Sequence, residues 1–224
     1  MTSTTSATAP GCETHDMVVV HRAFRREFEL LPRMVRAVSP GDLTQGGVIC
    51  SHAREMTTML HHHHAGEDEL VWPRLRERAE LAAGLVDRAQ TQHEVIGRLL
   101  AALDDAVQRF AETADPTSGA ELASVLDQVS IALNEHLDEE ETAILPVVAE
   151  TLTAAEWEEL SERGMAAMSK PRLLVLLGHI LEEADNDERA AFLKHIPLPA
   201  RVGYRLFGRR RYLRETAAQR RDLR

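Results

Sequence analysis

Four stretches of the chain repeat apolar residues at alternating steps of three and four, the spacing of one buried face of an α-helix. They span about residues 17–38, 49–70, 86–110 and 122–147. Helix-breaking residues separate them, as in Ser39-Pro40-Gly41 and in the run from Asp115 to Gly119. Long amphipathic helices with short connections favour an all-α fold, specifically an up-down-up-down four-helix bundle.

The pattern changes after Glu150, where shorter amphipathic segments follow. A capping box from Thr153 to Glu156 predicts a short helix, and two more are predicted over residues 172–184 and 187–195. Residues 201–224 then hold nine arginines against two acidic residues. The predicted organisation has three parts: a disordered N-terminus over residues 1–13, the bundle over residues 14–150, and a C-terminal helical extension with an Arg-rich tail over residues 151–224.

Composition excludes several classes of protein. Aromatic residues make up only 4% of the chain, too few for a typical all-β fold. Cys12 and Cys50 are isolated, which argues against a disulfide scaffold, a zinc ribbon or an iron–sulfur cluster. The formal charge of −10 disfavours nucleic acid as a partner. No membrane span is expected because no apolar run approaches the roughly 20 residues it needs, and no export signal is evident, so we expect a cytoplasmic protein.

Each helical stripe carries one histidine at a position that faces the core: His21, His63, His93 and His136. One such histidine is usually a hydrogen-bonded packing residue, but one on every helix is harder to explain by packing alone. Glu67 and Glu140 follow the second and fourth of these histidines by four residues. This spacing places imidazole and carboxylate one helical turn apart on the same face.

The His-x-x-x-Glu pattern is weak evidence alone, since His179 and Glu183 also match it. The two copies in the bundle differ from this third match because a proline, Pro73 or Pro146, follows each glutamate by six residues. A further core histidine also precedes each copy by 42 or 43 residues. These regularities indicate an internal duplication of a helical hairpin.

The predicted core therefore holds four imidazoles and two carboxylates. Burying unpaired carboxylates costs several kcal/mol each, and no Lys or Arg lies in these stripes to neutralise them. A pair of metal ions would supply the missing positive charge. Nitrogen and oxygen donors suit iron, manganese or zinc, and the absence of thiolate argues against structural zinc and copper(I). Bridging by both glutamates would leave coordination positions open for exogenous ligands.

The two His…His-x-x-x-Glu copies with their prolines resemble the hemerythrin-like, or HHE cation-binding, family over about residues 14–150. This resemblance implies a four-helix bundle around a non-haem di-iron centre, with two Fe ions and an oxo or hydroxo bridge. Carried over residue by residue, it implies six metal ligands: His21, His63, Glu67, His93, His136 and Glu140.

The sequence departs from the oxygen-carrying hemerythrins at two positions. Those proteins have another histidine one turn after the third-helix ligand, where this chain has Gly97, and an aspartate five residues after the fourth-helix ligand, where it has Glu141. We therefore expect one histidine fewer and more open metal positions. This favours a catalase-like or nitric oxide-consuming enzyme, or another protein of oxidative and nitrosative stress defence, acting on hydrogen peroxide, nitric oxide or dioxygen.

Two other functions remain open at this point. The protein is alternatively a non-catalytic dioxygen carrier, or an iron or oxygen sensor. A regulator that binds nucleic acid through the Arg-rich tail ranks third because the chain as a whole is acidic. The partner of the tail is not determined by the sequence.

The run of four histidines on the second helix needs a choice of register. Each residue turns a helix by about 100°, so we expect one of the four to face the core, and the duplication selects His63. His62 is the second choice, as a ligand or a supporting residue, whereas His61 and His64 are expected on the surface. His52, about 16 Å along the axis from His63, is expected to be buried and hydrogen-bonded outside the site.

Overall fold

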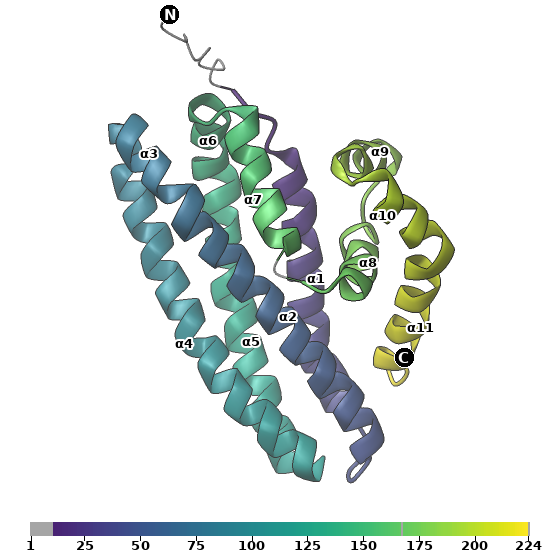
Figure 1. Ribbon diagram of the computed structural model, residues 1–224. Helices are drawn as coiled ribbons and strands as arrows, with labels where there is room; N and C mark the ends of the chain where they lie inside the picture. The colour runs from purple at the N-terminus through teal and green to yellow at the C-terminus, as the bar shows by residue number, and fades with distance from the viewer. Residues whose placement is uncertain (1–10, 167, 224) are drawn as a thin grey trace, which may run out of the picture.

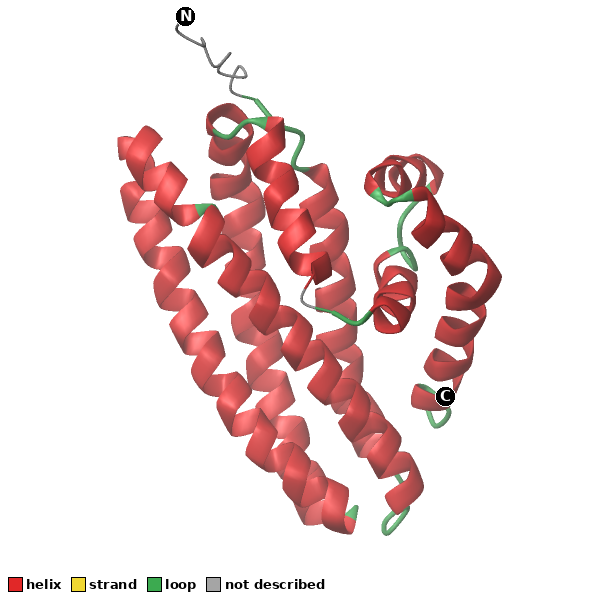
Figure 2. Cartoon of the chain, in the orientation of Figure 1, coloured by secondary structure: helices red, strands yellow, loops and turns green. Residues whose placement is uncertain are grey.

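The computed structural model describes residues 11–166 and 168–223, which are helical almost throughout (Figure 1, Figure 2). Four long helices lie side by side: α1 (His15–Ala37), α2 (Leu43–Leu70), α4 (Ala83–Thr113) and α5 (Pro116–Glu139). The short α3 (Trp72–Arg78) and η1 (Glu80–Ala82) connect α2 to α4. The described residues form no strand beyond one isolated bridge between Gly11 and Thr153. The prediction of an all-helical fold is confirmed.

α1 and α4 each pack against both α2 and α5. Two apolar cores lie along the helices packed in this way. The large core includes Phe28, Leu31, Ile49, Met56, Leu103 and Leu126. The small core includes Met17, Trp72, Leu75, Val86, Ile144 and Val148. Burying each such side chain contributes about 1.5–3 kcal/mol. The predicted histidine positions fall between the two cores on α1, α2 and α4, and at the end of the large core on α5.

At one end of the molecule, side-chain caps begin α2 and α5, and a residue in the left-handed conformation ends α4. The Asp42 side chain accepts the backbone N–H of Gln45 at 2.9 Å and so caps α2, as the sequence predicts. Ala114, with φ of 46°, ends α4, and Asp115 caps α5. The N–H of Gly41 donates to the carbonyl of Ala114 at 2.9 Å, which joins the two turns.

At the other end, α5 passes through a wide π-helical turn, η2 (Glu140–Ile144), into α6 (Leu145–Thr151). A π turn inserts one extra residue into the helical register, and such turns recur at functional sites. The sequence pattern predicts an uninterrupted helix here and misses the turn. Pro146 lies in the first turn of α6, where a missing N–H is tolerated.

The C-terminal extension comprises α7 (Ala154–Ala166), α8 (Lys170–Ile180), α9 (Asn186–His195), α10 (Leu198–Gly203), η3 (Tyr204–Gly208) and α11 (Arg209–Gln219). It lies along one side of the long helices, where α7 contacts α2, and α8 contacts α1 and α11 (Figure 1). The predicted capping box forms, since Glu156 N–H donates to Thr153 Oγ1 and Thr153 N–H donates to Glu156 Oε2.

One detail of the extension differs from the expectation. The helix predicted over residues 172–184 ends at Ile180, because Asp185 is the extended N-cap of α9 and the chain must leave the helix before it. The Arg-rich segment is helical, and it is partly paired within the chain. Arg220 binds Glu27 and Glu182, and Arg221 binds Asp42.

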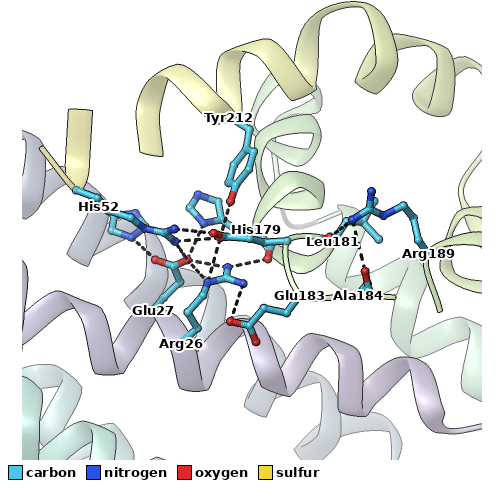
Figure 3. Close-up of polar contacts among 11 residues, drawn as sticks. Arg26, Glu27, His52, His179, Leu181, Glu183, Ala184, Arg189 and Tyr212 are labelled. Atoms are coloured by element: carbon cyan, nitrogen blue, oxygen red, sulfur yellow. Dashed lines mark hydrogen bonds and ion pairs between the residues drawn. The ribbon is translucent and has the colours of Figure 1, made fainter. Parts of the chain in front are cut away.

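A buried polar cluster attaches the extension to the long helices (Figure 3). Glu27 on α1 is 1% exposed and accepts hydrogen bonds from His52 Nε2 at 2.9 Å and His179 Nδ1 at 3.0 Å. Arg26 and Arg220 also donate to it, at 2.7 and 3.0 Å. Burial raises the pKa of Glu27, but the hydrogen bonds from the two histidines outweigh it and hold this pKa well below 4.5. His52 is therefore buried and hydrogen-bonded, as predicted.

The N-terminal boundary is only partly described. Residues 1–10 of the segment expected to be disordered lie outside the described residues. Gly11 and Cys12 donate backbone hydrogen bonds to the carbonyls of Leu152 and Ala149. Among the described helices, none combines the length and the apolarity that crossing a membrane requires.

Candidate metal centre

Imidazole rings and carboxylates from the four long helices and η2 meet between the two apolar cores. We call these seven residues the donor cluster: His21, His63, His64, Glu67, His93, His136 and Glu140. The structure thus brings together all six residues predicted from the sequence and adds His64. Six of the seven are buried, and the His63 side chain is 11% exposed.

The cluster divides into two overlapping groups of possible metal donors. In each group, one donor atom per residue lies within 4.8 Å of all the others. The first group is His64, Glu67, His93 and His136, and the second is His21, His63, Glu67 and Glu140. Glu67 belongs to both, so its carboxylate could bind a cation held by either group.

Ring nitrogens face each other in pairs on either side of Glu67. The Nε2 atoms of His21 and His63 lie 3.2 Å apart, as do those of His93 and His136. Glu67 Oε1 is 3.1 Å from His63 Nε2, and Glu67 Oε2 is 3.5 Å from His93 Nε2. The two oxygens of one carboxylate therefore contact one ring from each pair.

The π turn places two consecutive glutamates around His21. Glu140 Oε2 lies 3.6 Å from His21 Nε2 and 3.5 Å from His136 Nε2, inside the cluster. Glu141 Oε1 lies 3.0 Å from His21 Nδ1, on the outer side of the same ring. Glu141 thus orients a possible ligand, and Glu140 is itself a possible ligand.

Three rings of the cluster have a hydrogen-bond acceptor on their outer nitrogen. The pairs are His21 Nδ1 with Glu141 at 3.0 Å, His93 Nδ1 with Asp68 at 2.9 Å, and His136 Nδ1 with Gln92 Oε1 at 3.0 Å. From this geometry we infer a proton on Nδ1, which leaves the Nε2 lone pair facing the interior. Metal-binding histidines are typically held in this way.

Several interior atoms have no hydrogen-bond partner among the described residues. They are both carboxylate oxygens of Glu67, Oε2 of Glu140 and Nε2 of His64, all of them buried. Leaving such atoms unpaired is costly, and a bound cation would satisfy them. The donors are nitrogen and oxygen with no cysteine, a set that fits iron, manganese or zinc.

Burial disfavours the charged forms of five residues of the cluster. It raises the pKa of Glu67 well above 4.5, with a further contribution from Glu140, and it also raises the pKa of Glu140. Burial, with smaller effects from neighbouring rings, lowers the pKa of His63 and His64 well below 6.5 and that of His136 to about 2. These three imidazoles are neutral near pH 7 and keep a lone pair for a cation, while the carboxylates need one to stay ionised.

The expectation that His64 lies on the surface is wrong. His64 is 6% exposed, and its ring stacks on His93 with centroids 4.1 Å apart. Along a helix, Glu67 lies about 40° from His63 and about 60° from His64 in the opposite sense, so the two histidines flank it. The arc of α2 that faces the interior is wide enough for both. The His64-x-x-Glu67 spacing is the signal that could have found this residue.

Five imidazoles converge in the cluster, one more than the sequence predicts. Gly97 offers no side chain, but His64 supplies a ring from a different helix. His61 is exposed, as predicted. His62 is half-buried and belongs to neither donor group, and its carbonyl accepts a hydrogen bond from Arg163 on α7.

The comparisons with known proteins agree with this geometry. The family model described as the hemerythrin HHE cation-binding domain matches residues 12–148, which include every member of the donor cluster. No curated protein and no solved structure matches the chain. Because the family model covers more than half of the sequence, the chain belongs to the hemerythrin HHE cation-binding family.

Proposed function

We propose that this protein is a non-haem di-iron protein that binds or turns over small oxidants, namely hydrogen peroxide, nitric oxide or dioxygen. The observation that carries the proposal is the pair of overlapping donor groups, whose shared carboxylate, Glu67, is buried and accepts no hydrogen bond from the described residues. The proposal includes the up-down-up-down bundle arrangement for the four long helices. A role in oxidative or nitrosative stress defence follows from these oxidants.

In this proposal the two iron positions have different donors. One would be held by His64, His93 and His136 together with Glu67. The other would be held by His21, His63 and Glu140, also with Glu67. The first position has three nitrogen donors and the second has two carboxylates, so the second carries more negative charge. The two ions are therefore expected to differ in redox potential.

Bound iron would supply Lewis acidity and electrons, which buried imidazoles and carboxylates cannot. The chain's own contribution is positioning and shielding. Glu141, Asp68 and Gln92 fix the rings of three ligands, and the apolar cores above and below exclude water. The 11% exposure of the His63 side chain marks the side from which a small molecule can approach.

Peroxide loss tests the enzymatic version of the proposal. In disproportionation one peroxide is oxidised to dioxygen while another is reduced to water, so no separate electron donor is needed. Iron-loaded protein should remove peroxide faster than an equal amount of free iron. The Glu67→Gln variant should lose this activity, whereas Glu158→Gln, which changes an exposed glutamate on α7, should retain it. Activity no higher than that of free iron would exclude the catalase-like version.

A non-catalytic carrier gives a different result in the same preparation. It would show a visible absorption band that forms with oxygen and disappears under vacuum, without net consumption of oxidant. A sensor would instead change the folding or the position of the extension with oxygen or iron. Limited proteolysis of residues 151–223, with and without iron, distinguishes that outcome.

A further inference from the structure

A cavity of about 190 Å³ lies where the C-terminal extension meets α1 and α2. Residues from α1, α2 and each of α7 to α10 contribute to its wall. Its apolar lining includes Phe24, Met59, Trp157, Leu177, Phe192 and Ile196. Most of this wall comes from residues after 148, beyond the part of the chain that the family model matches.

The chemistry of the wall selects an uncharged occupant. No Lys, Arg or Glu occurs among the described residues that line the cavity, and the single carboxylate is that of Asp16. Its Oδ1 atom accepts hydrogen bonds from the indole N–H of Trp157 at 3.1 Å and from the backbone N–H of Met17 at 3.0 Å. The Oδ1 atom of this carboxylate is thus already hydrogen-bonded to the protein, and the described wall holds no Lys or Arg to attract an anionic ligand.

The size of the cavity selects an occupant larger than the small oxidants. An apolar protein cavity of about 150 Å³ is known to stay dry and to bind benzene. A cavity somewhat larger than this accommodates an aromatic ring with a small substituent, whereas a diatomic gas or a peroxide would fill little of it. Met59, Met165 and Met168 line the wall, and unbranched methionine side chains adapt their shape to an occupant.

The cavity also touches the donor cluster. The ring of His63 belongs to the cavity wall and also to the second donor group. Phe24, another wall residue, lies with its ring centroid 5.2 Å from that of His63. The cavity therefore meets the centre at His63, the most exposed of the seven residues of the donor cluster.

We propose that the C-terminal extension forms a binding site for an uncharged apolar molecule about the size of a substituted benzene, held against His63. Such a ligand changes the surroundings of one proposed iron ligand from outside the coordination shell. This effect on the iron ligand rests on the proposed function, whereas binding of the molecule in the cavity does not.

The test uses the full-length protein, fluorobenzene as the probe, and ¹⁹F NMR to measure binding. Gly164→Leu places a side chain in the cavity, and a Cβ atom at this position meets no atom within 4 Å, so the helix accepts it. Gly97→Leu is the matched control, because its Cβ also meets nothing and the position is exposed on α4. Ala200→Phe fills the cavity from α10 as a second variant. Circular dichroism confirms that each variant is folded.

Wild type and Gly97→Leu should bind fluorobenzene, and both filling variants should bind it at least ten-fold more weakly. Benzoate, which carries a negative charge on a substituent of the same ring, should bind more weakly than fluorobenzene. Absence of binding by wild type up to the solubility of fluorobenzene would overturn the proposal, as would equal binding by the filling variants.

A parallel titration of iron-loaded protein separates this proposal from the function on which its consequence rests. Fluorobenzene should shift the optical spectrum of the loaded wild type but not that of Gly164→Leu. If the protein takes up no iron yet binds fluorobenzene, the proposed function fails and the binding site stands. If the protein takes up iron and binds fluorobenzene without a spectral shift, the contact with His63 has no effect on the centre, and that part is overturned.

Discussion

Glu67 is the residue on which both donor groups depend. Around the axis of α2 its side chain points between those of His63 and His64, and its two oxygens face His63 on α2 and His93 on α4. It is also buried, with a pKa raised by burial and by Glu140. Burying a carboxylate in this position destabilises the metal-free fold, and binding of two cations would offset that cost.

The role of His64 can be tested separately, because His64 belongs to only one donor group. His64→Ala should lower the iron content from about two ions per chain to about one, since the group of His21, His63 and Glu140 keeps its donors. His61→Ala is the matched control, as it removes an exposed histidine from the same run. Metal analysis after gel filtration measures both. Two ions retained by the His64 variant would contradict its assignment as a ligand.

Glu27 gives a prediction on pH that is independent of the metal. Its pKa in the folded protein lies well below 4.5, so it stabilises the fold above pH 4.5, and this contribution is lost as pH falls through the folded-state pKa. Glu27→Gln should lower the free energy of unfolding near neutral pH by about 3 kcal/mol, the usual cost of breaking a buried ion pair.

Urea unfolding across a pH series measures this effect. The difference between Glu27→Gln and wild type should shrink as the pH falls below 4.5, because Glu27 then takes up a proton in the unfolded chain while it stays ionised in the folded protein until a lower pH. Glu29→Gln, at the exposed position two residues away, should match wild type at every pH. A difference that stays constant down to pH 2 would show that the charge of Glu27 does not stabilise the fold.

At the scale of the elements, α2 organises the site. α1 and α4 contact it, and α7 covers a further side, where a Cβ atom on Gly66 would lie 2.7 Å from Leu160. Contact on several sides gives α2 an inward arc wider than that of a surface helix. This is why two neighbouring histidines both reach the interior.

The packing of α8 against α11 depends on a glycine. A Cβ atom on Gly178 would lie 2.3 Å from Tyr212 Cγ, closer than any side chain allows. Gly178→Ala should therefore lower the free energy of unfolding by about 1–3 kcal/mol through overpacking. Gly164→Ala, where a Cβ meets nothing, should instead raise it by about 0.5–1 kcal/mol through helix propensity. Equal effects in chemical unfolding would contradict the close contact.

The helices could be predicted from the sequence because periodicity and caps are local signals. Asp42 and the box from Thr153 to Glu156 mark helix starts through hydrogen bonds to neighbouring backbone N–H groups, and both form. The π turn that begins at Glu140 carries no comparable local signal. The register of this turn depends on tertiary contacts, such as the one between Glu141 and His21 on α1.

Like the helices, most of the site could be predicted from a repeated sequence pattern. Repetition of His…His-x-x-x-Glu led to six of the seven residues that meet in the cluster. A single inward direction for α2 selects one residue of the histidine run, whereas the wide inward arc of this helix also buries His64. The apolar cavity was missed because it arises where the extension packs on α1 and α2, and such packing between distant segments leaves no periodic pattern.

At the scale of the whole molecule, stability and metal binding are coupled. The donor cluster lies between two apolar cores, so the cost of its unpaired carboxylates falls on the fold itself. Iron that binds only the folded state should stabilise it, by about 2.7 kcal/mol at a free concentration one hundred times Kd. Differential scanning calorimetry should show a higher Tm with iron and a return to the lower value with a chelator. An unchanged Tm would mean that iron does not bind the folded core.

The iron content of purified protein tests the central claim most directly. Protein produced in iron-rich medium should contain about two iron ions per chain, and Glu67→Gln should contain almost none because Glu67 belongs to both donor groups. Glu158→Gln, which changes an exposed glutamate, should match wild type. Two iron ions per chain in folded Glu67→Gln protein, or no iron in the wild type, would contradict the account.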